Sequence, residues 1–430
     1  MNYEQTLKYL FSKLPMYSRI GAAAYKADLT NTIQLCESLG NPQTSFKTIH
    51  VAGTNGKGSV SHMLASILQA AGYSTGLYTS PHLRDFRERI KINGGMIDKD
   101  FVVDFTQRID PLMQAIEPSF FEITVAMAFD YFAREKVDIA VIETGLGGRL
   151  DSTNIIIPEL SVITNIGMDH MNILGDSIEK IAREKAGIIK KGVPVVIGEE
   201  LPETRSIFEE VAHDNKAPLT FATEKRNVAN WRWEHHAFFV ELAEEHQTDH
   251  KVYQLDLAGI YQAKNLVTTL TACSILKNKG WALDESAIKT GLKQVKKTTG
   301  LHGRWETIHI QPLVILDVAH NPEGIRQLLQ QIEITEHHAL HMIIGMVNDK
   351  DIHSVLRVLP LQAEYYFTRA QIPRALDETE LARESAAHGL HGDAYPDVNT
   401  ALKAALSKAS EQDLIVVCGS VFLVGEVAGF

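Results

Sequence analysis

The sequence Val51-Ala-Gly-Thr-Asn-Gly-Lys-Gly-Ser59 places a glycine-rich turn, one lysine and one serine between two regular segments. Thr48-Ile-His-Val51 predicts a β-strand before the turn. A strand, a glycine-rich turn and a helix in this order are typical of a loop that binds phosphate. The helix is predicted because Gly72 is a stop signal and apolar residues before it recur at the three-and-four spacing of one helical face, at Val60, Met63, Leu64, Ile67, Leu68 and Ala71.

Each residue type in this turn has a part in binding phosphate. Backbone N–H groups of the turn and of the helix start point at the anion, Lys57 adds a positive charge, and the Ser59 hydroxyl can ligate Mg²⁺. The sequence differs from the common GxxxxGKS/T form, because Val51 replaces the first glycine and Gly58 separates the lysine from the serine. The alternative is a turn that merely connects strand to helix. We predict a nucleoside triphosphate site that includes Thr54, Asn55, Gly56, Lys57, Gly58 and Ser59.

Length and composition indicate a globular protein of two domains. The chain has 430 residues, of which 45% are hydrophobic and 22% are charged, and one core rarely organises so long a chain. The polar stretch Lys296-Lys-Thr-Thr-Gly-Leu-His-Gly303 precedes a fresh series of strand and helix patterns. We therefore predict one domain at residues 1–297 and a second at residues 298–430.

Short apolar runs alternate with helical patterns along the chain, which predicts a parallel α/β architecture. Residues 226–251 differ, because Glu, His and Trp alternate there with apolar residues, and they predict an antiparallel β insertion. The predicted strands of the α/β pattern are residues 75–78, 138–142, 160–166, 193–197, 313–316, 342–345, 365–368 and 414–417.

Charge and the lack of targeting features limit the classes of partner. The formal net charge of −11 argues against a general binder of nucleic acid or of acidic membranes, but it leaves room for a local basic pocket. No run of about 18 apolar residues exists and the start is not a basic, apolar leader, so a cytoplasmic protein is expected. No coiled-coil heptads are visible, and a monomer is expected. The scattered cysteines predict small buried side chains rather than a zinc site or disulfides: Cys36, Cys273 and Cys418.

Polar side chains follow two predicted strands at the sheet edge where open α/β sheets bind ligands. The run 138–142 leads into Glu143, and the run 160–166 leads into Gly167-Met-Asp-His170. Glu143, His170 and Ser59 are therefore candidates to hold one or two Mg²⁺ ions on the triphosphate, although imidazole is an uncommon Mg²⁺ ligand. The alternative for each strand-end residue is a side chain that faces solvent.

Lys185 occupies an apolar position of a predicted helix that starts near Asp176 or Ser177. It follows Ile178, Ile181 and Ala182 by seven, four and three residues, which is the spacing of one helical face. A lysine on a buried face is costly unless it is paired, neutralised or functional. The alternative is a buried stem whose ammonium reaches solvent at the helix edge.

The second half of the chain repeats the pattern of a strand followed by polar residues. Leu313-Val-Ile-Leu-Asp-Val-Ala-His-Asn-Pro322 ends a predicted strand with Asp317 and His320, and Gly303-Arg-Trp-Glu306 lies upstream. Asp317 can accept hydrogen bonds from ribose hydroxyls, while Arg304 and His320 can donate to phosphate oxygens. A second domain can thus close over the nucleotide; strand-end residues without a ligand are the alternative.

Six motifs occur in order along most of the chain: Gly53-Thr-Asn-Gly-Lys-Gly-Ser59, Tyr78-Thr-Ser-Pro-His-Leu83, Arg87-Glu-Arg-Ile90, Glu143-Thr-Gly-Leu-Gly-Gly148, Arg183-Glu-Lys-Ala-Gly-Ile188 and Asp317-Val-Ala-His-Asn-Pro322. Together they resemble the folylpolyglutamate synthase and dihydrofolate synthase family of the Mur ligase superfamily. The resemblance implies an α/β fold with an N-terminal P-loop ATP-binding domain, whose sheet is mostly parallel, and a smaller C-terminal Rossmann-like domain. The nucleotide would lie between them.

The resemblance also implies an ATP-dependent amide ligase. ATP would phosphorylate a folate or dihydropteroate carboxylate, and the amine of L-glutamate would attack the acyl phosphate, with Mg²⁺ and Lys57 stabilising the transferred group. Family members act on dihydropteroate, on folylglutamates or on both, and the sequence leaves this choice open. The alternatives are a cell-wall precursor ligase, which is disfavoured because no obvious uridine-nucleotide domain precedes Val51, and a P-loop regulatory ATPase, which leaves Arg304 and Asp317 unexplained.

By motif position the resemblance assigns roles to single residues. Asn265 in Tyr261-Gln-Ala-Lys-Asn265 matches the adenine contact, Asp317 the ribose contact, and Arg304 and His320 the phosphate contacts. Lys185 matches a lysine that the family carries as a carbamate. The implied metal contacts are Ser59, Ser80, Glu143 and His170, and the implied catalytic residues are Lys57, Lys185, His170 and Glu143.

The folate and glutamate contacts rest on a loop and on the C-terminal segment. The loop Ser80-Pro-His-Leu-Arg-Asp-Phe-Arg-Glu-Arg89 matches the one that the family orders with substrate, and its arginines can bind a glutamyl carboxylate in bidentate fashion. Gly419-Ser-Val-Phe-Leu-Val424 departs from the usual family form, which has a tyrosine after the second apolar position. The implied contacts are Pro81, His82, Arg84, Arg87, Arg89 and Ser420.

Overall fold

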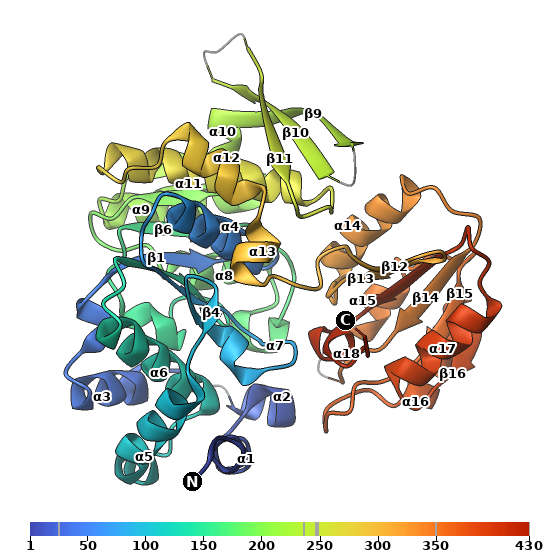
Figure 1. Ribbon diagram of the computed structural model, residues 1–430, viewed down its shortest axis with the longest axis horizontal. Helices are drawn as coiled ribbons and strands as arrows, with labels where there is room; N and C mark the ends of the chain where they lie inside the picture. The colour runs from blue at the N-terminus through green and yellow to red at the C-terminus, as the bar shows by residue number, and fades with distance from the viewer. Residues whose placement is uncertain (25, 235–236, 246–248, 349–350, 430) are drawn as a thin grey trace.

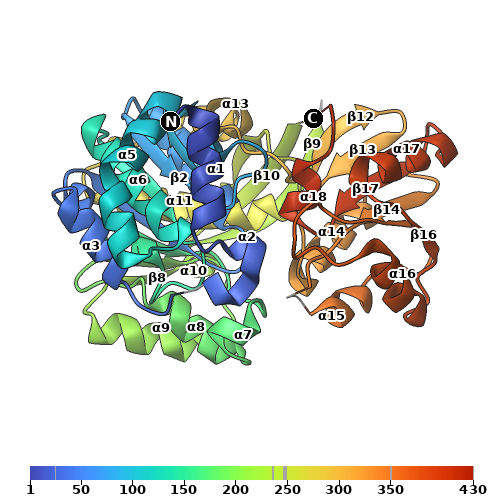
Figure 2. The same ribbon diagram turned by 90° about the horizontal axis from the view of Figure 1, so that it is seen from below.

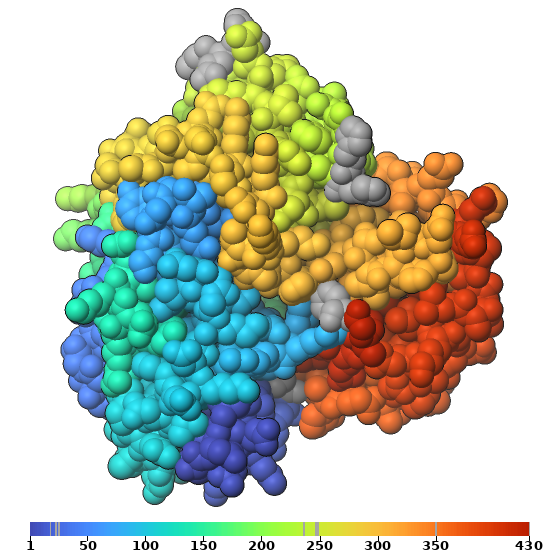
Figure 3. All heavy atoms as spheres, viewed as in Figure 1, coloured from blue at the N-terminus to red at the C-terminus, as the bar shows by residue number. Residues whose placement is uncertain are grey.

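The computed structural model describes the chain except residues 25, 235–236, 246–248, 349–350 and 430. The described part contains sheets of eight, three and six strands (Figure 1). The eight-stranded sheet builds what we call the N-terminal body, and the six-stranded sheet, on the right in Figure 1, builds the C-terminal body. The space-filling view shows the two bodies in contact along one boundary (Figure 3).

The eight-stranded sheet has the order β4-β3-β2-β5-β1-β6-β7-β8. Its strands from β2 to β8 pair in parallel, whereas β3 and β4 add an antiparallel hairpin at one edge. Parallel pairing brings the carboxyl ends of the central strands to one edge, where ligands bind such sheets. The strands are β1 (Lys47–Ala52), β2 (Thr75–Tyr78), β3 (Ile90–Ile92), β4 (Gly95–Met96), β5 (Ile139–Glu143), β6 (Leu160–Ile163), β7 (Val195–Ile197) and β8 (Leu219–Phe221).

The six-stranded sheet has the order β12-β13-β17-β14-β15-β16, and all its pairs are parallel except β12 with β13. The two α/β bodies confirm the predicted fold class. The strands of this sheet are β12 (Glu306–Ile310), β13 (Leu313–Leu316), β14 (Leu340–Ile344), β15 (Glu364–Phe367), β16 (Gly392–Ala394) and β17 (Leu414–Cys418).

The predicted antiparallel insertion is confirmed as the three-stranded sheet β9 (Arg226–Glu234), β10 (Ala237–Glu244) and β11 (Lys251–Leu255), in which β10 is central. Its inner face packs on the core of the N-terminal body, because Phe238, Val240 and Leu242 are fully buried there. The three cysteines are also buried and free, as predicted. No helix in the described ranges combines the length and the apolar composition that crossing a bilayer requires.

Helices cover both faces of each large sheet, and Figure 2 shows α8 and α9 side by side beneath the N-terminal body. The helices of that body are α1 (Tyr3–Lys13), α2 (Tyr17–Ile20), α3 (Thr30–Ser38), α4 (Lys57–Ala70), α5 (Lys99–Ile116), α6 (Phe120–Arg134), α7 (Met171–Leu174), α8 (Ile178–Ala186), α9 (Pro202–Asp214), α10 (Ala222–Lys225), α11 (Gln262–Asn278), α12 (Glu285–Leu292) and α13 (Val295–Thr299). Those of the C-terminal body are α14 (Pro322–Glu333), α15 (Ile352–Leu356), α16 (Glu378–Ala387), α17 (Val398–Lys408) and α18 (Val421–Gly425).

Helix α4 follows β1 and the glycine-rich turn, as the sequence predicts, and lies between the sheet and the layer of α11, α12 and α13. Ten of its residues, from Ser59 to Leu68, are buried. Packing on every side fixes the axis of α4, so its N-terminus is held at the carboxyl end of β1. A fixed helix start is what an anion-binding site requires.

We predict that Asp284→Ala lowers the free energy of unfolding by about 1 kcal/mol, the usual cost of losing an N-cap. The Asp284 carboxylate accepts a hydrogen bond from the Ala287 backbone N–H at 2.7 Å and starts α12, which packs on α4. Lys289→Ala on the exposed face of α12 is the control, because surface ion pairs contribute little. Urea denaturation measures the free energy of unfolding of both variants. Equal decreases in the two would contradict the assignment of Asp284 as a stabilising N-cap.

Candidate active site

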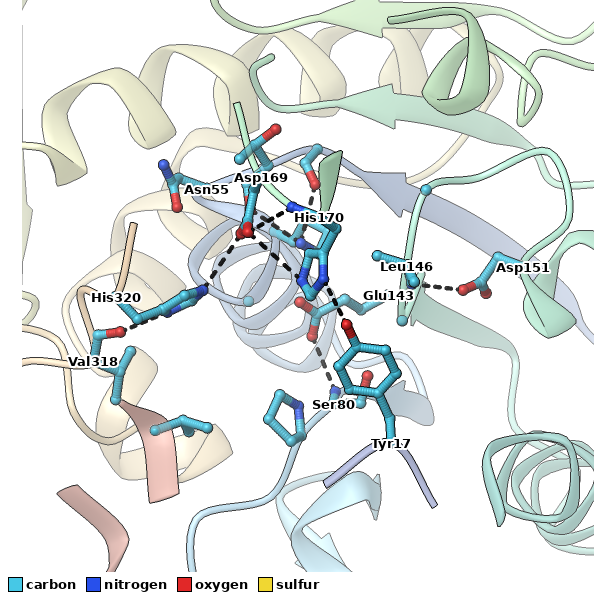
Figure 4. A pocket seen from close by; sticks show the side chains of 18 of the residues that line it. Tyr17, Asn55, Ser80, Glu143, Leu146, Asp151, Asp169, His170, Val318 and His320 are labelled. Atoms are coloured by element: carbon cyan, nitrogen blue, oxygen red, sulfur yellow. Dashed lines mark hydrogen bonds and ion pairs between the residues drawn. The ribbon is translucent and has the colours of Figure 1, made fainter. Parts of the chain in front are cut away.

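A cavity of about 360 Å³ lies where the two bodies meet. Its walls come from the turn after β1, the ends of β2, β5 and β6, helix α8 and a loop after β13. Figure 4 shows side chains from both bodies pointing into this space. The cavity therefore lies at the sheet edge at which ligands are expected.

The phosphate loop, residues 53–59, forms one wall of the cavity. Helix α4 starts after Gly56, which has a φ of +83° and provides no side-chain cap, so the first N–H groups of the helix are available to an anion. A Cβ atom at Gly56 would lie 2.4 Å from Asn265 Oδ1, so only glycine lets the loop approach α11 this closely. The Lys57 ammonium donates hydrogen bonds to the carbonyls of Gly53 and Thr54, at 3.0 and 3.1 Å.

The loop after β6 and the start of helix α11 fix the rest of the turn. The Asn55 backbone N–H donates to Asn165 Oδ1 at 2.8 Å, and the Thr54 hydroxyl donates to the Gly167 carbonyl at 3.0 Å. The Ser59 hydroxyl is buried and accepts a hydrogen bond from Gln262 Nε2 at 3.1 Å. The loop is thus pre-organised by β6 and α11 before any ligand binds.

Glu143, at the end of β5, is the central strand-end carboxylate of the cavity. Its Oε2 atom accepts a hydrogen bond from the Ser80 backbone N–H at 3.3 Å. Burial raises the pKa of Glu143 to about 7, and the nearby Lys57 and Arg304 cations oppose this shift. A cation bound beside a desolvated carboxylate of this kind favours its ionised form.

His170 follows β6 and faces Glu143 across the cavity in Figure 4. Its Nδ1 atom lies 3.0 Å from the Tyr17 hydroxyl, and its Nε2 atom lies 3.8 Å from Asp169 Oδ1. A tyrosine on Nδ1 holds the orientation of the ring. Asp169 also reaches the C-terminal body, since its Oδ2 atom is 3.5 Å from His320 Nε2 and accepts from Asn321 Nδ2 at 3.2 Å.

Lys185 lies on the buried face of α8, as its helical spacing predicts, and is 3% exposed. Helix α8 begins after the N-cap Ser177. The Lys185 ammonium donates a hydrogen bond to the Gly53 carbonyl at 2.8 Å, at the start of the phosphate loop. The lysine therefore points into the cavity rather than along the helix edge.

The C-terminal body contributes Arg304, Asp317 and His320 to the cavity. Asp317 follows β13 and is buried; its Oδ2 atom accepts hydrogen bonds from the Tyr261 hydroxyl at 2.6 Å and from the Trp305 N–H at 2.9 Å. Burial raises the pKa of Asp317, and the hydrogen bond from Tyr261 opposes the rise. An Arg304 amino group lies 3.5 Å from where a Cβ atom of Gly58 would be, so it reaches the phosphate loop.

Two family models match the chain: "Mur ligase middle domain" over residues 51–273 and "Mur ligase, glutamate ligase domain" over residues 303–421. The chain is 33% identical over 421 residues to the dihydrofolate synthase/folylpolyglutamate synthase of Bacillus subtilis, with 94% of each chain covered. The chain belongs to the folylpolyglutamate synthase/dihydrofolate synthase family.

Solved structures of this family have the same fold. The Escherichia coli FolC structure in complex with DHPP and ADP superimposes with a TM-score of 0.84 at 30% identity, covering 99% of this chain and 96% of that one. The Mycobacterium tuberculosis folylpolyglutamate synthase complexed with ADP gives a TM-score of 0.86 at 30% identity, covering 98% and 96%.

Residues 80–89, which the family motifs predict to bind folate, lie only partly at the cavity. Pro81 and Arg89 line the cavity, as does Ser420 from the C-terminal body. Arg89 is buried, donates to His82 Nδ1 at 2.7 Å and lies over the Phe120 ring. Arg87 forms an ion pair with Asp85 at 2.7 Å. Arg84 donates to the carbonyls of Gly425 and Val427, so it contacts the C-terminal body; His82, Arg84 and Arg87 are not among the described residues that line the cavity.

The cavity also contains residues that the family motifs do not include. Tyr17 arrives from α2, and the Arg374 guanidinium lies 4.9 Å from the centre of its ring and 5.4 Å from that of Phe422. Asp169 precedes His170 in the sequence, but only the fold reveals its contacts to His320 and Asn321 of the C-terminal body. Tyr261 begins the segment that includes Asn265, and only the fold brings its hydroxyl to Asp317.

Proposed function

We propose that this chain is an ATP-dependent ligase that adds L-glutamate to a folate or dihydropteroate carboxylate and releases ADP and phosphate. The observation that carries the proposal is one cavity that joins a phosphate loop and a buried strand-end carboxylate to Arg304 and Asp317 of the C-terminal body. A regulatory ATPase needs the phosphate loop and the buried carboxylate, but it does not need Arg304 and Asp317 from a second body. Membership of the family supplies the substrate class.

The reaction proceeds in two transfers. A carboxylate oxygen of the pterin substrate attacks the γ-phosphorus of ATP, the bond to the ADP oxygen breaks, and an acyl phosphate forms. The neutral amine of glutamate then attacks the acyl carbon, the C–O bond to phosphate breaks, and the amine loses a proton. Lys57 and the N–H groups of the phosphate loop stabilise charge on the transferred phosphoryl group.

The polar groups near Glu143 fit Mg²⁺. One carboxylate, one imidazole and two hydroxyls come from Glu143, His170, Ser59 and Ser80, and the raised pKa of Glu143 reflects a buried carboxylate that a cation would stabilise. Among the described residues, no group of three His, Cys, Asp or Glu side chains is arranged to hold a metal ion by itself, so phosphate oxygens and water would complete the shell. When bound, Mg²⁺ neutralises phosphate charge and orients the γ-phosphoryl group.

Lys185 is proposed to act as a carbamate. Its neutral amine would add to carbon dioxide with loss of a proton, which converts a buried cation into an anion. Burial favours the neutral amine that this step needs. Its position beside Gly53 supports a role at the phosphate end of the cavity, where a carbamate could orient a second metal ion.

The proposal also assigns a role to each of the two bodies. Residues 1–297 form the ATP-binding domain and residues 298–430 the glutamate-ligase domain, with Asn265 at the adenine. Pro81, Arg89 and Ser420 are the folate or glutamate contacts that the cavity supports, and His82, Arg84 and Arg87 remain predictions for the same loop. A cytoplasmic monomer is expected.

The substrate is tested by mass spectrometry of products formed with Mg-ATP and L-glutamate, using dihydropteroate in one tube and a reduced folate in another. A glutamyl mass increment in either tube supports the ligase and names its substrate, and increments in both identify a bifunctional enzyme. Robust ATP hydrolysis without any mass increment would contradict the proposal and favour the regulatory ATPase.

Tyr17→Phe is predicted to weaken Mn²⁺ binding, used as a probe for Mg²⁺, by about tenfold. The change removes the hydroxyl at His170 Nδ1 but keeps the ring beside Arg374. Isothermal titration with the non-hydrolysable ATP analogue present measures the affinity. Tyr9→Phe is the control, because it removes a hydroxyl of α1 that donates to Asp110 of α5, away from His170. Equal Mn²⁺ affinity in the two variants would show that the Tyr17 hydroxyl does not orient His170 for metal binding.

A further inference from the structure

Lys91, on β3, is a buried cation that the proposed mechanism does not use. It is 3% exposed, and its ammonium donates hydrogen bonds to the carbonyls of Thr299 at 2.7 Å and Gly300 at 3.3 Å. Burial lowers the pKa of Lys91, and the charge of Glu88 opposes this. For stability alone an apolar side chain of similar length would serve as well, because burying an ammonium is costly.

The two carbonyls that Lys91 binds lie at the end of α13, directly before the chain crosses to the C-terminal body. Residues 301–303 are the linker, and Arg304 follows immediately. The far end of the linker is also held: the Gly303 N–H donates to Glu306 Oε2 at 2.7 Å, and the Gly303 carbonyl accepts from the Val318 N–H at 3.0 Å. The position of Gly300 thus sets where the C-terminal body begins.

The phosphate-loop helix holds the same point. His62, on α4, lies with its Nδ1 atom 2.7 Å from the Thr299 hydroxyl, and Ser66 Oγ lies 2.8 Å from the Thr298 hydroxyl. A Cβ atom at Gly94, in the turn between β3 and β4, would lie 2.0 Å from the Thr298 carbonyl, so the hairpin also presses against the end of α13. Two elements of the N-terminal body therefore anchor the linker.

The loop of residues 80–89 joins this anchor to the cavity. Arg89 is two residues before Lys91, lines the cavity, and its carbonyl accepts a hydrogen bond from the Thr79 N–H at 3.0 Å. At its tip the same loop reaches the C-terminal body, where Arg84 Nε donates to the Gly425 carbonyl at 3.0 Å. One continuous segment, residues 80–91, thus contacts the cavity, the end of α13 and the C-terminal body.

We infer that Lys91 is a positioning residue for ligation. It fixes Thr299 and Gly300, the pivot from which the C-terminal body carries Arg304 and Asp317 to the phosphate loop, and it ties that pivot to the loop of residues 80–89. The inference rests on the proposed function, because it assumes that both bodies contact one nucleotide. A loosened pivot leaves the phosphate loop intact but lets the C-terminal body adopt several orientations. Closure of a domain over its ligand is the step that such a change impairs.

The test compares Lys91→Met and Thr299→Val with two controls. Methionine keeps the length of the lysine without its donors, and valine removes the hydroxyl that faces His62. Thr299→Ser keeps that hydroxyl, and Lys47→Met changes an exposed lysine of the N-terminal body. Spin labels on Glu135→Cys and Glu411→Cys report the distance between the bodies, because the three native cysteines are buried.

We expect Lys91→Met and Thr299→Val to lower kcat by roughly 2- to 30-fold, with KM for ATP unchanged, and to broaden the distance distribution measured with a non-hydrolysable ATP analogue. The two controls should match the parent in both readouts. If kcat and the distance distribution stay at parent values while only the melting temperature falls, the role is structural and the inference fails.

Two further outcomes are distinguishable. If Lys91→Met does not fold, Thr299→Val alone decides. If the parent protein shows no ligation, the proposed function fails, but the distance distribution with the ATP analogue still tests the pivot: unchanged widths in both variants overturn it, and broader widths support it.

Discussion

Lys57→Met should lower kcat for glutamate-dependent ADP release by about 10²- to 10³-fold, the size of effect seen when one donor to a developing anion is removed. The Lys57 ammonium already lies at the loop carbonyls of Gly53 and Thr54, so it needs little rearrangement to meet the γ-phosphate. Methionine keeps the apolar stem and the start of α4. The melting temperature should therefore stay close to that of the parent protein.

We attribute the expected loss of kcat to the missing contact with the transferred phosphoryl group, and not to the change in the net charge of the protein. Lys180→Met, on the exposed side of α8, removes the same charge at a distance from the cavity and should leave kcat unchanged. Steady-state kinetics at saturating ATP measures both variants. A Lys57→Met enzyme that keeps more than about a tenth of the parent kcat would contradict the role given to Lys57.

Lys185→Met and Lys185→Ala should each lower kcat by about 10- to 100-fold, the usual effect of losing a group that orients metal ligands. Methionine fills the space of the stem, so it separates the loss of the amine from the loss of packing. The alanine variant leaves a space beside Gly53 that a small carboxylate can occupy. Formate or acetate should therefore restore part of the activity to Lys185→Ala and none to Lys185→Met.

The carbamate itself has a direct signature. Parent protein supplied with ¹³C-labelled bicarbonate should show a carbamate carbon resonance that both Lys185 variants lack, and removal of carbon dioxide should lower the parent activity. A fully active Lys185→Ala enzyme would contradict the assignment. Lys180→Ala, which changes a lysine of the same helix, should retain the resonance.

The phosphate loop and its flanking strand and helix could be predicted because they form one local pattern. The position of Glu143 at the cavity could be predicted because it ends an apolar strand, and parallel pairing brings such ends to one edge. Lys185 could be singled out because a charged residue at an apolar helical position conflicts with the periodicity around it. These signals need no knowledge of long-range contacts.

The contacts across the boundary could not be predicted. Tyr17 contacts His170 and Arg374, which are far from it in the sequence. No local sequence pattern at any of the three residues predicts these contacts. Lys91 has no distinguishing pattern in the sequence, and only the fold brings it to the end of α13. The family motifs place Arg84 and Arg87 among the folate contacts, and only the fold shows that Arg84 donates to the Gly425 carbonyl and that Arg87 pairs with Asp85.

The most direct test of the account is the fate of a carboxylate oxygen. The substrate found by mass spectrometry is prepared with ¹⁸O in the carboxyl group to which glutamate is added, and is converted with Mg-ATP and L-glutamate. Transfer through an acyl phosphate predicts that each released phosphate carries one ¹⁸O atom from that carboxylate. Product formed with unlabelled phosphate would show that the carboxylate never attacked the γ-phosphorus, and would contradict the proposed mechanism.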